Sequence, residues 1–243
     1  MQFRISSFSD KGARANQEDA FIAEIISGNT VLAMVADGVG GHNKGEFASD
    51  CIKENLLAIK DLLVTTDDAC TEIEKIYRST SEQIIRRGSE DAEYFDAGTT
   101  ATTLYFHNNS YYLVHCGDTR AYLFRNKKVD LLTEDHTIVQ DLLNNGEISE
   151  EYAHKHPERH MLTSVIGLDW FTFRVDTAGP LPAKAGDVFL LTSDGVHDVL
   201  SERALLEIMN ENSRNTNLAQ LICDTAIINN TRDNVTAVVI TIL

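Results

Sequence analysis

Three short segments of the chain place an aspartate beside a glycine at the end of an apolar run. They are AMVADG, LVHCGD and FLLTSDG, and they contain Asp37, Asp118 and Asp194. A fourth aspartate, Asp233 in TRDNVTAVVI, precedes an apolar run instead. For one Asp-Gly pair a plain turn is the simpler interpretation, because both residues favour turns. If the four strand ends meet, however, the carboxylates cannot all ionise unpaired, and divalent cations would relieve their repulsion.

The available donor types narrow the choice of cation. Carboxylates and backbone carbonyls without thiolates favour magnesium or manganese, with calcium as a less favoured alternative. Gly38 follows Asp37, and a residue without Cβ lets its carbonyl approach a metal, while Gly40 and Gly41 permit a turn. The dinucleotide spacing G-x-G-x-x-G fails because position 43 is Asn43. The glycines therefore indicate a metal site rather than a nucleotide loop.

Composition limits the class of protein. The chain has 243 residues and only three prolines, and we find no low-complexity linker, so we expect one domain over 1–243. Lysine and arginine total 21 against 37 acidic residues, a formal charge of −16. Such a chain should repel nucleic acid and anionic membranes. Four cysteines without paired spacing, no signal peptide and no membrane-length apolar run predict a cytoplasmic protein.

The elements that must position these residues follow from the hydrophobic pattern. Short apolar or β-branched runs predict strands at 2–8, 20–26, 30–36 and 187–194 and in the closing segment NVTAVVITI. Helical spacing predicts helices at 45–63, 67–87, 201–212 and 216–230. Four alternating runs, TTATTLYF, SYYLVHC, RAYLFR and KVDLL, predict an antiparallel meander. We therefore expect an α+β fold, a central β-sandwich of two antiparallel sheets flanked by α-helices.

Eight segments in chain order resemble the type 2C protein phosphatases, the metal-dependent (PPM-type) serine/threonine phosphatases, and specifically their compact bacterial members. The segments are SDKGARANQEDAF, VADGVGGHNKGEFAS, DAGTTATTL, VHCGDTRAYLF, LTEDHT, HPERHMLTSVIG, LLTSDGVHDVLS and RDNVTAVVI. The resemblance implies the type 2C fold and hydrolysis of phosphoserine and phosphothreonine in proteins. It also implies partners, namely phosphorylated proteins and a cognate bacterial serine/threonine kinase that this enzyme would oppose. We expect a monomer.

The resemblance further implies a metal centre at one end of the sandwich, with two tightly bound Mn²⁺ or Mg²⁺ ions. Asp37 would bridge both ions. The Gly38 carbonyl would bind one of them, and Asp194 and Asp233 the other. Asp118 resembles the residue that helps to bind a weaker third ion in bacterial members.

Three further residues complete the implied site. Arg14 matches the phosphate-binding arginine, and Glu18 and Asp19 would hold metal-bound waters. Two cations about 3.5–4 Å apart can lower the pKa of a bridging water toward neutrality, and the resulting hydroxide would attack phosphorus in line. No protein nucleophile is then needed, and we expect Asp37, Arg14 and Asp118 to be catalytic.

The chain departs from the animal members of the family at Val39, where they have a histidine suited to protonate the leaving alcohol. A metal-bound water or His42 could serve instead. The resemblance also implies a flap at about 144–165 that shapes substrate access. That region contains H-x-H-x-x-x-H at His154, His156 and His160, a spacing that could bind zinc, although the flap is the preferred interpretation.

We expect the other polar residues in these segments to stabilise the fold. Two other functions remain as alternatives. We expect Thr99, Thr100, Thr102 and Thr103 to form a packed sheet face. Asp135 and His136 should brace the loop before the flap. An inactive module that recognises phosphoproteins is one rival, although the complete set of four aspartates argues against it. A phosphatase of small phosphoesters is the other, and no residue pattern argues against it.

Overall fold

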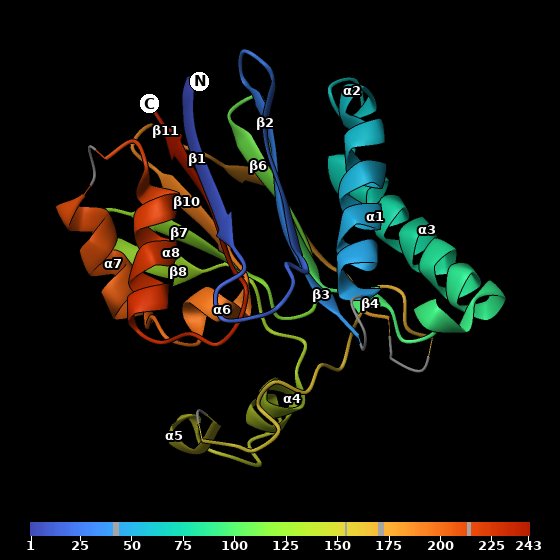
Figure 1. The fold of residues 1–243 in the computed structure, drawn as a ribbon. Helices are drawn as coiled ribbons and strands as arrows, with labels where there is room; N and C mark the ends of the chain where they lie inside the picture. The colour runs from blue at the N-terminus through green and yellow to red at the C-terminus, as the bar shows by residue number, and fades with distance from the viewer. Residues whose placement is uncertain (41–43, 154, 170–172, 213–214) are drawn as a thin grey trace.

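Two antiparallel sheets pack face to face, and helices cover the outer face of each (Figure 1). The structure is a computed structural model that describes residues 1–40, 44–153, 155–169, 173–212 and 215–243. The expected α+β sandwich flanked by helices is confirmed. None of the helices in these ranges is long and apolar enough to cross a membrane.

The first sheet contains five strands in the order β1-β11-β10-β7-β8. Their bounds are Phe3–Asp10 (β1), Val235–Ile242 (β11), Val188–Thr192 (β10), Arg120–Arg125 (β7) and Lys128–Leu131 (β8). Two helices, α7 (Glu202–Glu211) and α8 (Leu218–Ile228), lie on its outer face (Figure 1). Leu205 and Ile222 from these helices are fully buried against Leu190 and Val239 of the sheet.

The second sheet has the order β2-β3-β5-β6-β9, with the short strand β4 paired to the end of β3. The bounds are Asp19–Ser27 (β2), Thr30–Val39 (β3), Ala101–His107 (β5), Ser110–Cys116 (β6), Asp176–Pro182 (β9) and Gly98–Thr99 (β4). Its outer face carries helices α1 (Lys44–Ala58), α2 (Lys60–Leu63) and α3 (Ala69–Glu90). A single 3₁₀ turn, η1 (Ala92–Tyr94), follows α3.

Strand β3 is buried on both of its faces, which explains its unbroken apolar sequence. Val31, Ala33 and Val35 belong to the core between the two sheets. Leu32 and Met34 alternate with them and pack in the core beneath α1 and α3. Because successive side chains of a strand point to opposite faces, a strand with two covered faces needs apolar residues at every position. The same burial fixes the register that places Asp37 at the strand's end.

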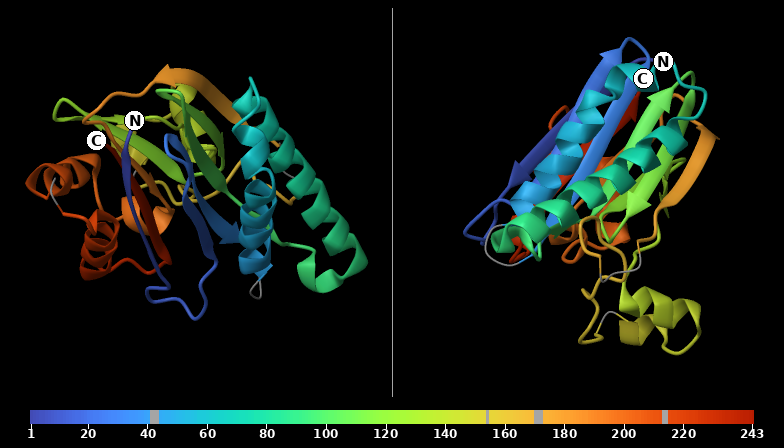
Figure 2. Two further views of the ribbon diagram at one scale, coloured as in Figure 1. Left: turned by 90° about the horizontal axis from the view of Figure 1, so that it is seen from above. Right: turned by 90° about the vertical axis from the view of Figure 1, so that its right-hand side faces the viewer.

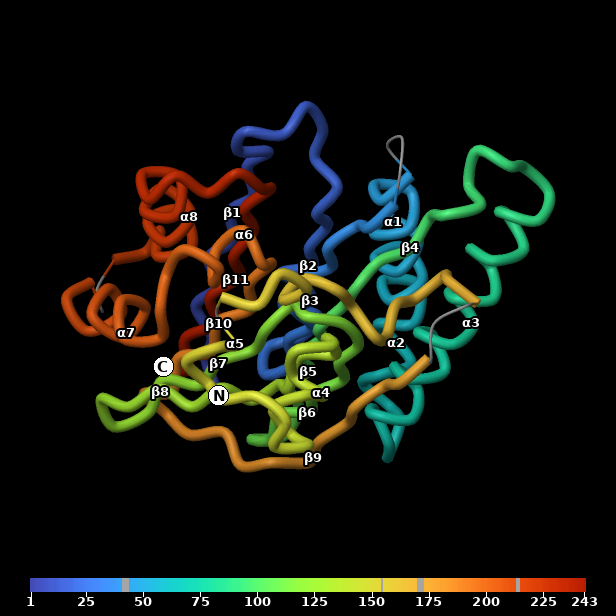
Figure 3. The backbone as a smooth tube through the Cα atoms, turned by 90° about the horizontal axis from the view of Figure 1, so that it is seen from below, coloured from blue at the N-terminus to red at the C-terminus, as the bar shows by residue number. Residues whose placement is uncertain are grey.

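The two ends of the sandwich differ in the segments that lie there. Both chain termini lie at one end, whereas helices α4 (Ile138–Asn144) and α5 (Glu150–Ala153) project beyond the other (Figures 1 and 2). Seen from that end, α4 and α5 lie in front of the strand ends (Figure 3). Thr137 and Leu162 pair across the base of this projection. From here on we therefore define the flap as residues 138–161, in place of the range of about 144–165 that the family resemblance implied. The short helix α6 (Asp194–His197) lies at the same end of the sandwich.

Three details of the predicted elements were wrong. The four runs after Gly98 do not form one meander, because β5 and β6 pair in the second sheet and β7 and β8 in the first. The chain crosses between the sheets at Gly117, whose φ of +106° favours glycine. The helix predicted at 45–63 is interrupted at Ile59. Strand β9 was missed because its sequence, DTAGPLP, contains residues that rarely occur in strands.

Candidate metal centre

The strand ends at the flap side of the sandwich bring buried carboxylates together. Asp19, at the start of β2, lies opposite Asp37, near the end of β3. Burial raises the pKa of Asp37 well above its ordinary value, and the charges of Asp19, Asp194, Asp118 and Asp233 raise it further. The expected convergence of the four strand-end aspartates is therefore present. Five carboxylates this close disfavour one another's ionised forms unless cations accompany them.

Asp194 occupies the first position of α6, directly after β10 and Ser193. Its Oδ1 is buried and has no hydrogen-bond partner within the described ranges. Burial raises the pKa of Asp194 well above its ordinary value, and the charges of Asp118, Asp233 and Asp198 raise it further. The pKa of Asp118 is raised to about 7, first by burial and then by Asp135. Buried carboxylate oxygens without donors are what a cation site requires.

One carboxylate oxygen of Asp19 accepts hydrogen bonds, and the other has no described donor. Its Oδ2 accepts hydrogen bonds from Ser193 Oγ and Thr236 Oγ1, both at 2.7 Å. Its Oδ1 is buried, and no described donor contacts it. Burial raises the pKa of Asp19 to about 6. Because Thr236 lies in β11 of the first sheet and Ser193 directly follows β10, whereas Asp19 begins β2 of the second sheet, these bonds also join the two sheets beside the site.

Gly38 lies at a point of close backbone approach. A Cβ at this position would meet the backbone of Gly45, at the start of α1, and the carbonyl oxygen of Glu18. The Gly38 N–H donates to that Glu18 carbonyl at 3.1 Å. The absence of a side chain at Gly38 is thus required by helix packing as well as by the predicted approach of its carbonyl to a metal.

Arg14 reaches the site from the loop between β1 and β2. Its Nη2 donates to Asp233 Oδ2 at 2.6 Å, and its side chain is 54% exposed. Burial lowers the pKa of Arg14, but Asp233, Asp194 and Asp37 outweigh burial and raise it. The structure therefore brings Arg14 to the carboxylates and pairs it with Asp233, a residue expected to bind metal. Its exposed guanidinium has room to contact a ligand as well.

Asn234 anchors the loop that carries Arg14, and sequence reasoning missed it. Its Oδ1 accepts from the Glu18 N–H at 2.8 Å. Its Nδ2 donates to the carbonyls of Lys11 and Asn16 at 2.9 and 2.8 Å. The side chain of Glu18 is partly buried nearby, and burial raises its pKa. The available signal was the position of Asn234 between Asp233 and the first residue of β11.

A cavity of about 360 Å³ separates the flap from the sandwich. Asp118, Asp194 and Asp198 line it from the sandwich, and Val139 and His160 line it from the flap side. His160 Nδ1 lies 3.5 Å from Asp198 Oδ2. The ligand atoms of His160, Asp194 and Asp198 all lie within 4.8 Å of one another, so these three residues could hold a metal ion. Of the three, sequence reasoning had placed only Asp194 in the metal site.

The histidines that the sequence offered as a proton donor or as zinc ligands do not come together in the described residues. His42 and His154 lie outside the described residues. His156 Nδ1 accepts from the Glu158 N–H at 3.2 Å, whereas His160 faces Asp198. The two described members of the H-x-H-x-x-x-H pattern therefore have different partners.

The structural interpretations of the remaining polar residues are confirmed in part, because the threonines are buried but do not share one sheet face: Thr102 bonds His115, whereas Thr103 bonds Tyr77 of α3. The four threonines expected to form a packed face are fully buried, namely Thr99, Thr100, Thr102 and Thr103. Two of them also fix the end of β3, because Thr99 Oγ1 and the Thr100 N–H both donate to the Asp37 carbonyl at 2.9 Å. Asp135 braces the chain before the flap through a two-pronged ion pair with Arg120.

Comparison with known proteins places this arrangement in a family. A family model described as protein phosphatase 2C matches residues 9–226. The chain belongs to the protein phosphatase 2C family. The resemblance drawn from the eight sequence segments is therefore confirmed, and the buried carboxylates lie in a protein phosphatase 2C domain.

Other proteins resemble this protein phosphatase 2C chain along most of its length. Serine/threonine protein phosphatase PstP of Mycobacterium tuberculosis is 34% identical over 208 residues, which are 85% of this chain and 38% of PstP. Serine/threonine phosphatase stp of Listeria monocytogenes is 30% identical over 215 residues, 87% of this chain and 84% of that protein. This chain thus spans about two fifths of the length of the mycobacterial relative but most of the listerial one.

A solved structure of the catalytic domain of PstP in complex with two manganese ions superposes on this protein phosphatase 2C chain with a TM-score of 0.84. The two are 30% identical, and the match covers 98% of this chain and 97% of the other. The similarity therefore extends over the whole sandwich and its flap end.

Proposed function

We propose that this chain is a metal-dependent protein phosphatase that removes phosphate from phosphoserine and phosphothreonine. One observation carries the proposal: Asp37, Asp118, Asp194 and Asp19 converge with raised pKa values, and two of their buried oxygens have no described donor. Such a cluster is stable near neutral pH only with bound cations or bound protons. Membership of the protein phosphatase 2C family makes cations the better explanation.

The donor set fits Mn²⁺ or Mg²⁺, because it offers carboxylate and carbonyl oxygens. We propose that two ions bind tightly, held by Asp37, the Gly38 carbonyl, Asp194 and Asp233, with a weaker third at Asp118. The two manganese ions in the PstP catalytic domain support this stoichiometry. When bound, such cations polarise phosphoryl oxygens and make water nucleophilic at neutral pH.

The side chains around the carboxylates would orient the reacting groups. Arg14 offers planar donors to phosphoryl oxygens, a geometry that suits phosphate better than a point charge does. In the structure its Nη2 contacts Asp233, so the bound phosphoryl group would share this guanidinium with that carboxylate. The buried Oδ1 of Asp19 and the partly buried carboxylate of Glu18 would accept hydrogen bonds from waters in the site.

The substrate would enter beside the flap. The cavity between the flap and the sandwich opens next to Asp118 and Asp194 and is large enough for a phosphorylated side chain. We propose that the whole of residues 1–243 acts as one catalytic domain on phosphorylated proteins, as a monomer, in the cytoplasm, and opposes a serine/threonine kinase. A formal charge of −16 would favour substrates with basic flanking residues.

A substrate panel tests this proposal. The protein, supplied with manganese, is offered an aryl phosphate, phosphoserine and phosphothreonine peptides, a phosphotyrosine peptide and small sugar phosphates. We expect phosphate release from the aryl phosphate and from the phosphoserine and phosphothreonine peptides. Turnover confined to the sugar phosphates would identify a small-molecule phosphatase, and binding of phosphopeptides without any turnover would identify a recognition module.

A further inference from the structure

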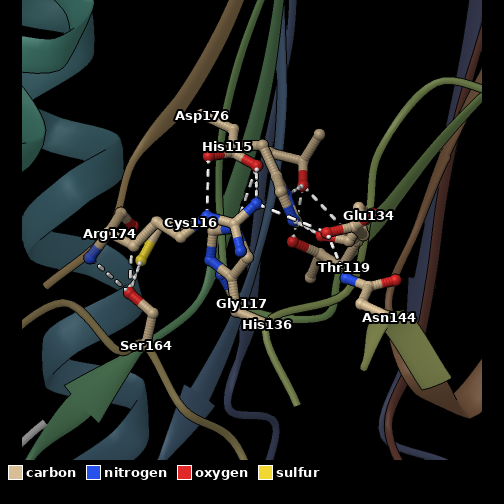
Figure 4. Close-up of polar contacts among 11 residues, drawn as sticks. His115, Cys116, Gly117, Thr119, Glu134, His136, Asn144, Ser164, Arg174 and Asp176 are labelled. Carbon is tan, nitrogen blue, oxygen red and sulfur yellow. Dashed lines mark hydrogen bonds and ion pairs between the residues drawn. The ribbon is translucent and has the colours of Figure 1, made fainter. Parts of the chain in front are cut away.

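His136 is a buried histidine at the junction between the flap and the sandwich, and the proposed chemistry makes no use of it. The residue is 1% exposed. It lies two residues before α4, on the segment that enters the flap. Its contacts extend in two directions, toward the segment that carries Asp118 and toward the outer base of the flap (Figure 4).

The inward contacts fix the backbone next to Asp118. The Gly117 N–H donates to His136 Nδ1 at 3.1 Å, and the His136 N–H donates to the Gly117 carbonyl at 2.7 Å. Gly117 has a φ of +106°, and a Cβ there would collide with Thr100. Gly117, the residue before Asp118, is thus held in a conformation that favours glycine, with its N–H bound to the His136 ring and its carbonyl bound to the His136 backbone.

The outward contacts connect the same ring to the flap. Because Nδ1 accepts a hydrogen bond, the ring proton is on Nε2, which faces Asp176 Oδ2 at 3.3 Å. Asp176 receives two hydrogen bonds from Arg174, at 2.9 and 2.7 Å. Arg174 also reaches Glu134 at 3.4 Å, and Glu134 accepts from Asn144, the last residue of α4, at 3.0 Å. Figure 4 shows this series of polar contacts from Gly117 to Asn144.

The far side of the flap is tied to the same point. The Thr163 N–H donates to the His136 carbonyl at 2.8 Å. The next residue, Ser164, exchanges hydrogen bonds with the backbone of Arg174, at 2.9 Å to its carbonyl and 2.8 Å from its N–H. The entering and leaving segments of the flap therefore meet at His136, so the ring and backbone of one residue connect both segments with the Asp118 turn.

We propose that His136 is a positioning residue that holds the Asp118 carboxylate in place for cation binding and couples it to the flap through Asp176 and Arg174. This inference rests on the proposed function, in which Asp118 serves the weaker metal site. Partners that orient a metal ligand typically contribute about 10–100-fold to metal affinity. Since His136 acts on the backbone beside the ligand rather than on its carboxylate, we expect an effect near the lower limit, about tenfold.

The test is a calorimetric Mn²⁺ titration, paired with the Mn²⁺ dependence of aryl phosphate turnover. His136→Ala should weaken the weakest manganese site about tenfold, leave the two tighter sites unchanged, and recover its kcat at high Mn²⁺. His136→Asn should restore most of the affinity, because its Oδ1 can replace Nδ1 as the acceptor for Gly117. Asp176→Ala should weaken the same site to a smaller degree, and it should add nothing in the His136→Ala background.

The matched control is His107→Ala. It also removes a histidine whose Nδ1 is hydrogen-bonded, here to Thr30 at 3.0 Å, on the second sheet away from the Asp118 turn. We expect it to leave all manganese affinities unchanged. If His136→Ala and His107→Ala behave alike in the titration, His136 has only a structural role and the inference is wrong.

Three further outcomes are decisive. Should His136→Ala fail to fold, Asp176→Ala decides, and an unchanged weak site in that variant overturns the coupling. If the wild-type protein binds no manganese and releases no phosphate, the proposed function itself fails, and this inference fails with it. Normal wild-type binding with unaffected variants overturns the inference alone.

Discussion

The replacement of Asn234 by alanine should separate loop anchoring from metal binding. The side chain of Asn234 is 4% exposed and makes three hydrogen bonds to backbone groups of residues 11–18. Each such bond contributes about 0.5–1.5 kcal/mol, so their loss should lower the free energy of unfolding by about 1.5–4.5 kcal/mol. Water can replace part of these bonds because the loop is largely exposed, so we expect a loss of about 2 kcal/mol.

The effect on activity should exceed the effect expected from stability alone. The loop that Asn234 anchors carries Arg14, whose proposed hydrogen bond to the phosphoryl group is worth at least about 1.5 kcal/mol. Loss of that bond corresponds to at least a tenfold decrease in kcat/KM, since about 1.4 kcal/mol is a factor of ten. The tight manganese sites should keep their affinity, because Asn234 contributes no ligand to them.

The assay compares Asn234→Ala with Asn55→Ala, a matched control on the outer face of the second sheet. Asn55 donates two hydrogen bonds, to Thr80 and Gln83 at 2.9 Å, between α1 and α3. Urea unfolding in chelator should show comparable losses of stability. Aryl phosphate kinetics should show a tenfold or larger decrease for Asn234→Ala only. Equal kcat/KM values for the two variants would refute the proposed role of the loop.

Three other perturbations have defined outcomes. Asp37→Asn should lower kcat by at least ~10³-fold, the order of one major electrostatic contributor, and a near-normal rate would make Asp37 a turn residue. Arg14→Ala should lower kcat/KM about tenfold or more without weakening manganese binding, and Arg14→Lys should rescue it only partly; loss of manganese affinity would contradict phosphate binding as its main role. In the metal-free protein, Asp118 has a pKa of about 7 against an ordinary 3.8, so its contribution to stability should decrease as pH rises from about 4 to about 7. Asp118→Asn should therefore gain stability over the wild type across that pH window, as measured by thermal unfolding in chelator, and a constant difference would refute the raised pKa.

Local sequence patterns predicted the parts of the fold that depend on continuous apolar runs. The run 31–36 is apolar at every position because both faces of β3 are covered, and the pattern therefore gave the strand and the position of Asp37 at its end. The helices that cover the sheets were predicted from apolar residues at helical spacing, because each helix buries only one face. Strand β9 was not, because pairing with β6 overrides the poor strand propensity of its glycine and prolines.

Contacts that depend on closure of the whole domain could not be predicted. The four runs after Gly98 alternate alike, and nothing local indicates that the chain crosses to the other sheet at Gly117. Asn234 and His136 are common types of turn and loop residue in sequence. Their roles arise only when distant segments meet in space. Asn234 contacts Lys11, more than 200 residues away in the chain, and His136 contacts the far end of the flap.

Equilibrium dialysis with manganese tests the central claim most directly, that the converging carboxylates hold catalytic cations. The wild-type protein, first freed of metal by chelator, is dialysed against Mn²⁺, and bound metal and phosphopeptide turnover are measured on the same samples. We predict two tightly bound ions per chain, with turnover that is absent in chelator and returns as these sites fill, and fewer bound ions in Asp37→Asn. Full turnover after exhaustive chelation, or unchanged binding in Asp37→Asn, would contradict the claim.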